Sequence, residues 1–261
     1  MLKISHISKT FNPGTVNSKK VMDDFLLDVA KGQFVTIIGA NGAGKSTLFN
    51  AIAGSIIPDT GSIVLDGEDI TLKSEHKRAR SIGRLFQDPM RGSAPGMSVE
   101  ENLALSAGRG GWMSRISKAD RRDFRDRLAL LDLGLEDRMK QPVGLLSGGQ
   151  RQALTLLMAT ITPPKLLLLD EHTAALDPAT AEKVLALTTK IVKEDNLTCL
   201  MITHNMQSAL ALGDRTIMMD RGDIILDVAG EERRGLTVEN LLLRFKNASG
   251  RALSNDRMLL T

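Results

Sequence analysis

Eight consecutive residues, Gly39–Ser46, constrain this chain more than any other segment. They read Gly-Ala-Asn-Gly-Ala-Gly-Lys-Ser, a full match to the phosphate-binding loop pattern, between the strand-like run Gln33–Ile38 and the helix-like run Thr47–Ala53. Glycines let the backbone wrap around phosphate oxygens, and the N-terminus of the following helix offers N–H donors and a favourable dipole. The segment therefore predicts a strand, loop and helix that together bind phosphate groups.

Individual residues of this loop have distinct predicted roles. Lys45 reaches the β- and γ-phosphates, and the Ser46 hydroxyl ligates Mg²⁺. The other predicted contacts to the nucleotide come from Gly39, Asn41, Gly42, Ala43, Gly44 and Thr47. A glycine-rich turn without a ligand is the alternative, and the preceding strand, the spacing and the Lys-Ser pair together argue against it.

A second acidic pair follows the apolar run Leu166–Leu169. Asp170 and Glu171 emerge at the carboxyl end of that predicted strand, the end at which open α/β sheets bind ligands. Asp170 is the better candidate for holding Mg²⁺, through water, and Glu171 for polarising the attacking water. Alone, such a pair is also common on solvated loops; with the phosphate loop, it indicates a P-loop NTPase.

The segment Leu145–Gln152 separates the classes of P-loop NTPase, which include kinases, helicases, GTPases and transporters. It reads Leu-Leu-Ser-Gly-Gly-Gln-Arg-Gln and precedes the helical run Ala153–Ala159. By itself, Ser147 would serve equally well as the N-cap of that helix. The segment closely resembles the signature sequence of the ABC ATPases, and the order and spacing of the motifs favour this interpretation.

The resemblance to the ABC ATPase family covers nearly the whole chain, from Met1 to about Val228, with at least six motifs in the family's order. It implies that Phe11 stacks on adenine, although the family more often has tyrosine there and Phe11 would also suit a loop anchor. It implies that Gln87 ligates Mg²⁺ and lies in the loop that senses the metal and the membrane partner. A solvated strand end is the alternative for Gln87.

Two further residues take roles from the same resemblance. Asp177 belongs to the loop that crosses the dimer interface, and His204 is the switch histidine that contacts the γ-phosphate, with a hydrogen-bonded core histidine as the alternative. The predicted catalytic residues are thus Glu171, His204 and Lys45. His172 departs from the family, which most often has proline after the catalytic glutamate, so we expect a local backbone difference there rather than lost activity.

The resemblance also implies a site shared by two subunits. Each chain supplies its phosphate loop and acidic pair to one ATP, while its signature residues cover the γ-phosphate of the ATP in the opposing subunit. Those signature residues are Ser147, Gly148, Gly149 and Gln150. Hydroxyl and N–H groups stabilise phosphate charge only after two subunits close and exclude water. ATP and Mg²⁺ are the implied cofactors, and the partner is a second copy or a paralogous ATPase.

The fold class expected is α/β: a P-loop NTPase with a mostly parallel sheet, an antiparallel β subdomain and an inserted helical subdomain. We expect a single ABC ATPase domain over residues 1–261. Its parts are a catalytic core with β subdomain (1–90 and 160–228), a helical subdomain (about 91–159) and a tail (229–261). Leu241–Phe245 in the tail is predicted to form an amphipathic helix that packs on the body, with dimerisation as a minority alternative.

The composition favours a protein that is peripheral to the membrane over one that spans it. A formal net charge of +3 from 34 basic and 31 acidic residues gives no reason to expect nucleic acid as a partner. The single cysteine, Cys199, lies in an apolar run typical of a buried strand. No apolar stretch approaches the roughly 18 residues that span a bilayer, and no signal peptide is recognised, so we expect the cytoplasmic face of the cell (inner) membrane.

Transport is the leading interpretation, with integral membrane permease subunits as partners. The alternative is a soluble ABC ATPase that acts in assembly or on nucleic acid; a P-loop phosphotransferase would not need the signature segment. Without a fused membrane segment, the chain resembles prokaryotic importer ATPases, and the segments Phe11–Thr15 and Glu171–Asp177 resemble a poorly characterised subgroup of them. That likeness implies an external solute-binding protein and an amino-acid-like solute.

Overall fold

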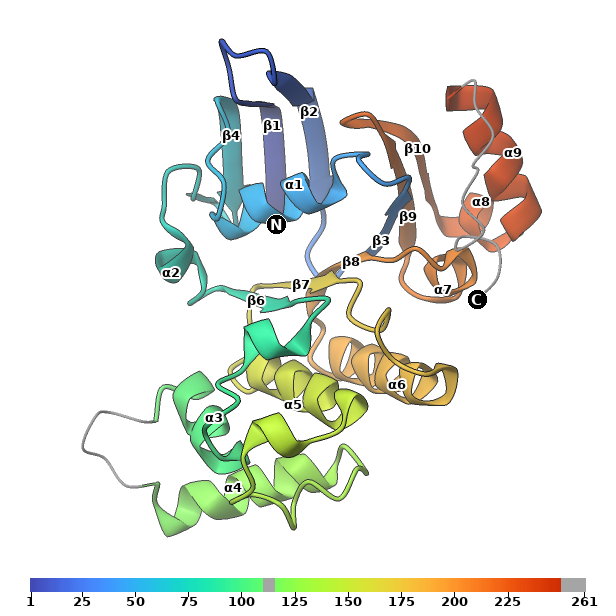
Figure 1. The fold of residues 1–261 in the computed structure, drawn as a ribbon. Helices are drawn as coiled ribbons and strands as arrows, with labels where there is room; N and C mark the ends of the chain where they lie inside the picture. Colours follow the sequence, from blue (N-terminus) through green and yellow to red (C-terminus); the bar gives the residue numbers. More distant parts are fainter. Residues whose placement is uncertain (110–115, 250–261) are drawn as a thin grey trace. The chain divides into compact units, whose positions relative to one another are not determined.

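The computed structural model describes residues 1–109 and 116–249 of the 261-residue chain. They form two compact units, and each is described by itself. The first unit comprises Met1–Ile82 and the chain from Leu197 onward, and the second comprises Gly83–Asn196. In Figure 1 the second unit contains the green and yellow elements.

The first unit contains an antiparallel sheet with strand order β2-β1-β4-β5 (Figure 1). Its strands are β1 (Leu2–Phe11), β2 (Lys19–Val29), β4 (Thr60–Leu65) and β5 (Glu68–Asp69). Leu2 of β1 pairs with Val29 on one side and with Leu65 on the other. Leu2 and Ile4 are buried while Lys3 between them is exposed, so the alternation at the N-terminus marks a strand with one face on the core.

The other strands of the first unit are mostly parallel and lie in the order β10-β9-β3-β8. These strands are β3 (Phe34–Gly39), β8 (Thr198–Ile202), β9 (Arg215–Asp220) and β10 (Asp223–Ala229). β3 is parallel to β8 and β9, whereas β10 is antiparallel to β9. Every residue of β3 and β8 is buried, which explains their apolar sequences. Cys199 is among them, and burial raises the pKa of its thiol, so the predicted buried strand cysteine is confirmed.

The helices of the first unit are α1 (Lys45–Ala53), α2 (Glu75–Arg78), α7 (Met206–Ala211), α8 (Gly230–Arg234) and α9 (Val238–Ser249). Arg78 is only 2% exposed, and its Nη1 donates to the carbonyl oxygens of Ala51 and Ile52, at 2.7 and 2.8 Å. These carbonyls belong to the last turn of α1, where a helix leaves its acceptors without intrahelical donors. Arg78 therefore fixes the end of the helix that begins with Lys45.

The predicted amphipathic helix near the C-terminus is confirmed as part of α9. Leu241 and Phe245 are buried, one turn apart on the same face. They pack in a cluster with Ile38 of β3, Met206 of α7 and Met218 of β9. The apolar face of α9 is thus covered by its own unit.

The second unit contains two neighbouring strands, β6 (Ile82–Leu85) and β7 (Leu166–Asp170). Between them in sequence lie η1 (Pro89–Gly92), α3 (Val99–Ser106), α4 (Lys118–Ala129), η2 (Val143–Leu145) and α5 (Gly148–Thr160), and α6 (Pro178–Glu194) follows β7. Leu103, Phe124 and Leu154, one from each long helix of the lobe, are fully buried in its core. The predicted inserted helical lobe is therefore confirmed.

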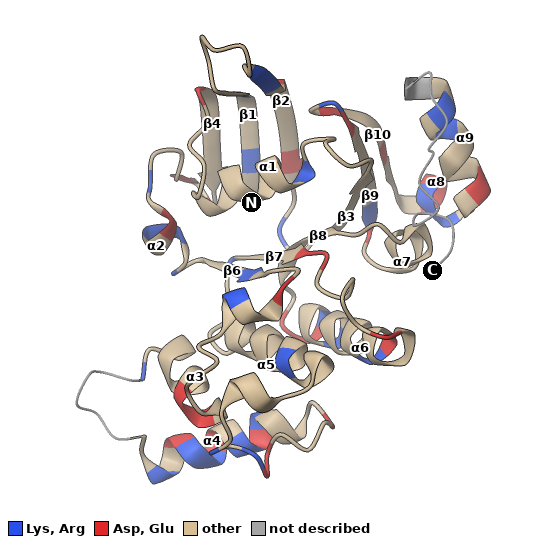
Figure 2. Cartoon of the chain, viewed as in Figure 1, with Lys and Arg blue, Asp and Glu red and all other residues tan. Residues whose placement is uncertain are grey.

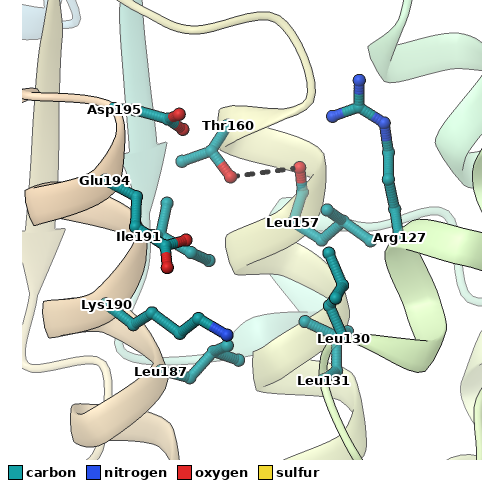
Figure 3. Close-up of a pocket in the computed structure, with 10 residues that line it drawn as sticks. All are labelled: Arg127, Leu130, Leu131, Leu157, Thr160, Leu187, Lys190, Ile191, Glu194 and Asp195. Carbon is teal, nitrogen blue, oxygen red and sulfur yellow. Dashed lines mark hydrogen bonds between the residues drawn. The ribbon is translucent and has the colours of Figure 1, made fainter.

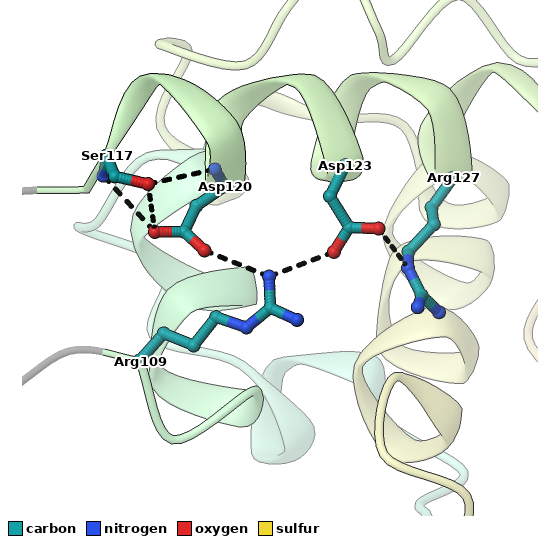
Figure 4. Close-up of polar contacts among 5 residues, drawn as sticks. All are labelled: Arg109, Ser117, Asp120, Asp123 and Arg127. Carbon is teal, nitrogen blue, oxygen red and sulfur yellow. Dashed lines mark hydrogen bonds and ion pairs between the residues drawn. The ribbon is translucent and has the colours of Figure 1, made fainter.

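The exposed face of α4 is held by ion pairs between its own charges and Arg109 (Figure 4). Arg109 Nη1 lies 2.9 Å from both Asp120 Oδ1 and Asp123 Oδ2, and Asp123 also pairs with Arg127 at 3.0 Å. Figure 2 shows that both basic and acidic residues lie along α4. Each exposed ion pair of this kind contributes little to the stability of the fold. We therefore interpret the charged residues of α4 as a solvent-exposed helix face.

The described residues confirm the predicted combination of a mostly parallel sheet, an antiparallel sheet and an inserted helical lobe. Within residues 1–109 and 116–249, none of the helices has both the length and the apolar character needed to cross a lipid bilayer.

Candidate active site

The predicted phosphate loop joins the buried strand β3 to helix α1. Gly39 at the end of β3 has no room for a side chain, because a Cβ there would lie 2.2 Å from the carbonyl oxygen of Met219 in β9. Gly44 caps α1 with φ 100°, a conformation that side-chain-bearing residues rarely adopt. Both glycines are therefore required by the backbone, which brings the N-terminus of α1 to the end of the sheet.

Lys45 lies folded over this loop. Its Nζ donates to the carbonyl oxygens of Gly39 and Ala40, at 2.6 and 3.1 Å, and the residue is only 5% exposed. The positive charge is thereby held at the N-terminus of α1, where the helix dipole also favours an anion. Asn41 and Ser46 are exposed beside it, so the loop presents a cation, N–H donors and a hydroxyl to an incoming phosphate group.

His204 follows the strand that neighbours the phosphate loop. β8 runs parallel to β3, and Thr203 N donates to the carbonyl oxygen of Ile37 at 3.1 Å, which extends the pairing beyond the end of β8. The chain after β8 and the chain after β3 therefore leave the sheet at the same edge. Half-buried His204 lies at that edge, so the structure brings Lys45 and His204 to one end of the first unit.

Phe11 lies at the end of the antiparallel sheet. It is the last residue of β1, pairs with Lys19 and is partly exposed, and the chain from Asn12 to Ser18 is exposed. The ring is thus available at an edge of the first unit, and its stacking on adenine stays a prediction.

In the second unit, β7 delivers the predicted acidic pair. Leu166–Leu169 are fully buried, and Asp170 ends the strand with its side chain 16% exposed. Arg84 of β6 pairs with it: Arg84 Nη2 lies 3.6 Å from Asp170 Oδ2, and Arg84 Cζ lies 4.6 Å from the ring centre of Phe86. Sequence reasoning missed Arg84, although an arginine within a short strand that leads to Gln87 was a usable signal.

The residue after Asp170 has an unusual backbone. Glu171 has φ 48°, in the left-handed region, and His172 next to it is buried and hydrogen-bonded to Thr188. The local backbone difference expected beside His172 stays a prediction. Burial lowers the pKa of His172 to about 4, which keeps the ring neutral at pH 7.

The signature segment forms the N-terminus of α5. Ser147 is its N-cap, and Gln150 returns the interaction: Gln150 N donates to Ser147 Oγ at 3.3 Å, and Ser147 N donates to Gln150 Oε1 at 3.2 Å. The capping role considered from the sequence is therefore present. Ser147 and Gly148 nevertheless stay exposed, so capping leaves them accessible to a ligand of another subunit.

The structure also brings the signature segment and the predicted interface loop together. A Cβ at Gly149 would lie 2.1 Å from Thr180 Cγ2, and a Cβ at Gly148 would lie 3.3 Å from Leu176 Cδ2. Asp177 caps α6 by accepting from Thr180 N at 3.1 Å, and hydrogen bonds from Thr180 lower the pKa of its carboxyl. The N-termini of α5 and α6 thus lie side by side, each with a polar cap that is exposed.

Gln87 is exposed directly after β6, and Asp88 behind it caps η1 by accepting from Met90 N at 2.9 Å. The residues predicted to ligate Mg²⁺ are therefore a hydroxyl on α1, a carboxylate at the end of β7 and an amide after β6. Such oxygen donors are those that Mg²⁺ prefers, usually with water and phosphate oxygens in addition. Ser46, Gln87 and Asp170 are thus each of a residue type suited to Mg²⁺.

A cavity of about 170 Å³ lies elsewhere, between α4, α5 and α6 (Figure 3). Leucine and isoleucine side chains line it, with Arg127, Lys190 and Glu194 among the charged residues around it. It includes none of the residues predicted to bind nucleotide. We therefore do not assign it to the predicted active site.

The sequence of this chain is similar to those of known transport proteins. A protein-family model described as "ABC transporter" matches residues 22–174. A tyrosine transport ATP-binding protein of Clostridioides difficile is 45% identical over 251 residues, which cover 95% of this chain and 100% of the relative. A methionine import ATP-binding protein of Histophilus somni is 36% identical and a glycine betaine/carnitine/choline transport ATP-binding protein of Bacillus subtilis is 34% identical. Each aligns with 86% of this chain, which spans 64% and 57% of their respective lengths.

Solved structures agree with these sequence relationships. The ADP conformation of an ATP-binding cassette of an ABC transporter is 27% identical with a TM-score of 0.77, covering 96% of this chain and 97% of its own. A dimeric cassette in a post-hydrolysis state, bound to ADP and Pi, is 28% identical with a TM-score of 0.75, covering 90% of this chain and 100% of its own. The predicted fold class is thereby confirmed over almost the whole chain.

Proposed function

Because this chain belongs to the ABC transporter family of ATP-binding subunits, we propose that it powers the import of an amino-acid-like solute. As a member of that family it binds and hydrolyses ATP as one subunit of a transporter. The proposed cargo rests on one observation: the likeness to a tyrosine transport ATP-binding protein extends over the whole of that relative. An aromatic amino acid such as tyrosine is therefore the first solute to test.

The first unit supplies the proposed phosphate-binding groups. The ammonium of Lys45, now 2.6 Å from the Gly39 carbonyl oxygen, would turn to the β- and γ-phosphates, because a charge-assisted contact to phosphate is stronger than one to a carbonyl. The N–H groups of the first turn of α1 would donate to the same phosphates. His204 would contact the γ-phosphate from the neighbouring strand, and Phe11 would stack on adenine.

The second unit supplies the proposed hydrolytic groups. Glu171 would orient and polarise a water for in-line attack on the γ-phosphorus, accepting its proton as the bond to the leaving ADP breaks. Gln87 and Asp170 are the proposed Mg²⁺ ligands of this unit, and Ser46 is that of the first unit; the metal neutralises phosphate charge when bound. Ser147, Gly148, Gly149 and Gln150 would cover the γ-phosphate of the ATP in the opposing subunit. Asp177 would lie at the same interface.

ATP binding would thus close two subunits on each other, and hydrolysis would release them. Members of this family form dimers and work with membrane permease subunits. We propose a second copy or a paralogous ATPase as the other subunit, an external solute-binding protein reached through the permease, and the cytoplasmic face, where ATP is supplied. Movement would pass to the permease through the Gln87 loop and the helical lobe.

Purification from native membranes tests the transport proposal directly. We would tag the chain, extract membranes of its host in mild detergent, and identify by mass spectrometry whatever remains bound. A multi-span permease at near-equal amount is the expected result, and its type distinguishes import from export. Recovery mainly from the soluble fraction with ribosomes, DNA or assembly proteins would contradict transport.

Uptake measurements then test the solute. The purified assembly, reconstituted in vesicles with its solute-binding protein, should accumulate labelled tyrosine only when ATP is present. Labelled methionine and glycine betaine serve as comparisons, because relatives named for these two solutes are also similar to this chain. Accumulation of glycine betaine without any amino acid would contradict the proposed cargo while leaving the ATPase assignment intact.

A further inference from the structure

His172 occupies a special place in the second unit. It directly follows Glu171, and among the four histidines of the chain it alone is buried, at 2% exposure. A buried polar side chain requires a hydrogen-bond partner, since an unsatisfied one costs free energy. The identity of that partner shows what the imidazole does.

The partner is a hydroxyl on helix α6. His172 Nε2 lies 3.1 Å from Thr188 Oγ1, and Thr188 Oγ1 lies 2.8 Å from the carbonyl oxygen of Val184, one turn earlier in α6. A threonine hydroxyl has one proton. Because that proton is donated to Val184, the hydroxyl accepts from His172, and the ring carries its proton on Nε2.

This hydrogen bond ties the chain after β7 to α6. Between the two lies the turn from Glu171 to Asp177, in which Ala174 N donates to the Glu171 carbonyl oxygen at 3.0 Å. Glu171 has φ 48° there, a conformation that persists for a side-chain-bearing residue only where its surroundings hold it. The buried ring and the hydroxyl of Thr188 are such surroundings.

We infer that His172 is a positioning residue that, through Thr188, holds the backbone of Glu171 so that its carboxylate faces the attacking water. The inference rests on the proposed role of Glu171 as the base. His172 restrains this turn by its burial and by its hydrogen bond to α6.

Thr188→Val tests this inference in the full-length chain. Valine keeps the shape of threonine and removes the acceptor, so kcat for ATP hydrolysis should fall about 10- to 100-fold, because misplacing a reacting group by about 1 Å costs that much. The affinity for ATP, measured without turnover, should change less than about twofold, since the phosphate-binding groups are untouched. Thr188→Ser keeps the hydroxyl and should restore most of kcat.

Thr189→Val provides a matched control. Thr189 also donates to the carbonyl oxygen one turn earlier, that of Leu185 at 2.9 Å, but within the described residues it makes no hydrogen bond to His172. The variant should keep the parental kcat.

The outcomes separate two failures. The positioning role of His172 is overturned if Glu171→Gln abolishes hydrolysis while Thr188→Val keeps the parental kcat. It is also overturned if kcat falls as much in Thr189→Val as in Thr188→Val. In both cases the role of Glu171 as the base remains. If Glu171→Gln hydrolyses ATP at the parental rate, both the base and the positioning role are overturned. A loss confined to kcat in Thr188→Val, reversed in Thr188→Ser, supports the inference.

Discussion

Arg84 and Asp170 form an ion pair between the neighbouring strands β6 and β7, with Arg84 Nη2 3.6 Å from Asp170 Oδ2. Both side chains are largely buried, at 12% and 16% exposure. The arginine also lies over the ring of Phe86, which precedes Gln87. One side chain therefore links the carboxylate proposed to hold Mg²⁺ with the start of the loop proposed to sense it.

Removing this arginine should destabilise the fold. Arg84→Met removes the guanidinium beside a mostly buried carboxylate, and we expect the free energy of unfolding to fall by about 1–2 kcal/mol, less than for a fully buried pair. Urea unfolding of Arg84→Met, Asp170→Asn and the double variant should give a coupling energy of about 1 kcal/mol. Arg91→Met is the control, because Arg91 also lies over Phe86 and no ion pair to Asp170 is recorded for it. Additive effects of the two substitutions would show that the pair contributes nothing.

Lys45→Ala should weaken nucleotide binding. The ammonium is held beside the loop by two carbonyl oxygens, and its loss removes a charge-assisted contact to phosphate, which predicts an increase of about 10- to 100-fold in Kd. Titration with a fluorescent ATP analogue measures this. An unchanged Kd would exclude Lys45 from the phosphate site.

Glu171→Gln should separate binding from hydrolysis. Glutamine keeps the size of the side chain but cannot accept the proton of the attacking water, so turnover should be lost while ATP still binds. The variant should accumulate as an ATP-bound dimer in size-exclusion chromatography, because closure would no longer be followed by release. A monomeric variant with full turnover would contradict both the base and the motor cycle.

Much of this fold could be predicted because its patterns are local. The apolar runs of β3, β7 and β8 and the turn residues of the phosphate loop mark their own positions in the sequence. The start of β2 at Lys19 and the whole of β10 are harder to predict. Most residues in those stretches are exposed or half-buried, so hydrophobic periodicity does not reveal them.

The contacts that surround the predicted site could not be found in the same way. Arg84 with Asp170 and His172 with Thr188 pair residues that are distant in sequence, and charged or polar types are expected at the surface by default. The burial of Arg78 against the end of α1 is a third example. Motif patterns name the groups that react, whereas the tertiary packing that holds them depends on neighbours that a single sequence does not specify.

Gly149→Ala tests whether packing against Thr180 requires glycine at this position, independently of any contact with nucleotide. The added Cβ would lie 2.1 Å from Thr180 Cγ2, so we expect a loss of about 1–3 kcal/mol in the free energy of unfolding from overpacking. Thr180→Ser removes the methyl group, and in that background Gly149→Ala should cost clearly less. Gly148→Ala is the control, since its Cβ would meet only Leu176 Cδ2 at 3.3 Å. Equal costs in both backgrounds would rule out the contact with Thr180 as the cause.

His172 should make the stability of the fold sensitive to mild acid. Its pKa is about 4 in the folded chain because of burial, against 6.5 for the ordinary group. At pH 7 the ring is mostly neutral in both states, so its titration has little effect on stability. As the pH falls from 6.5 to 4, the unfolded chain binds a proton that the folded chain does not, and the free energy of unfolding decreases by up to about 3 kcal/mol at pH 4.

Urea unfolding at several pH values, without nucleotide or metal, measures this dependence. His172→Gln is the matched variant, because glutamine keeps a neutral N–H donor but does not titrate. Carboxylates that lose stability in acid, such as Asp177, whose pKa is lowered by Thr180, contribute equally to both proteins and cancel in the difference. The free energy of unfolding of the parental chain should therefore decrease relative to that of His172→Gln as the pH falls from 6.5 to 4. A constant difference across this range would show that His172 is protonated as readily in the folded chain as in the unfolded one.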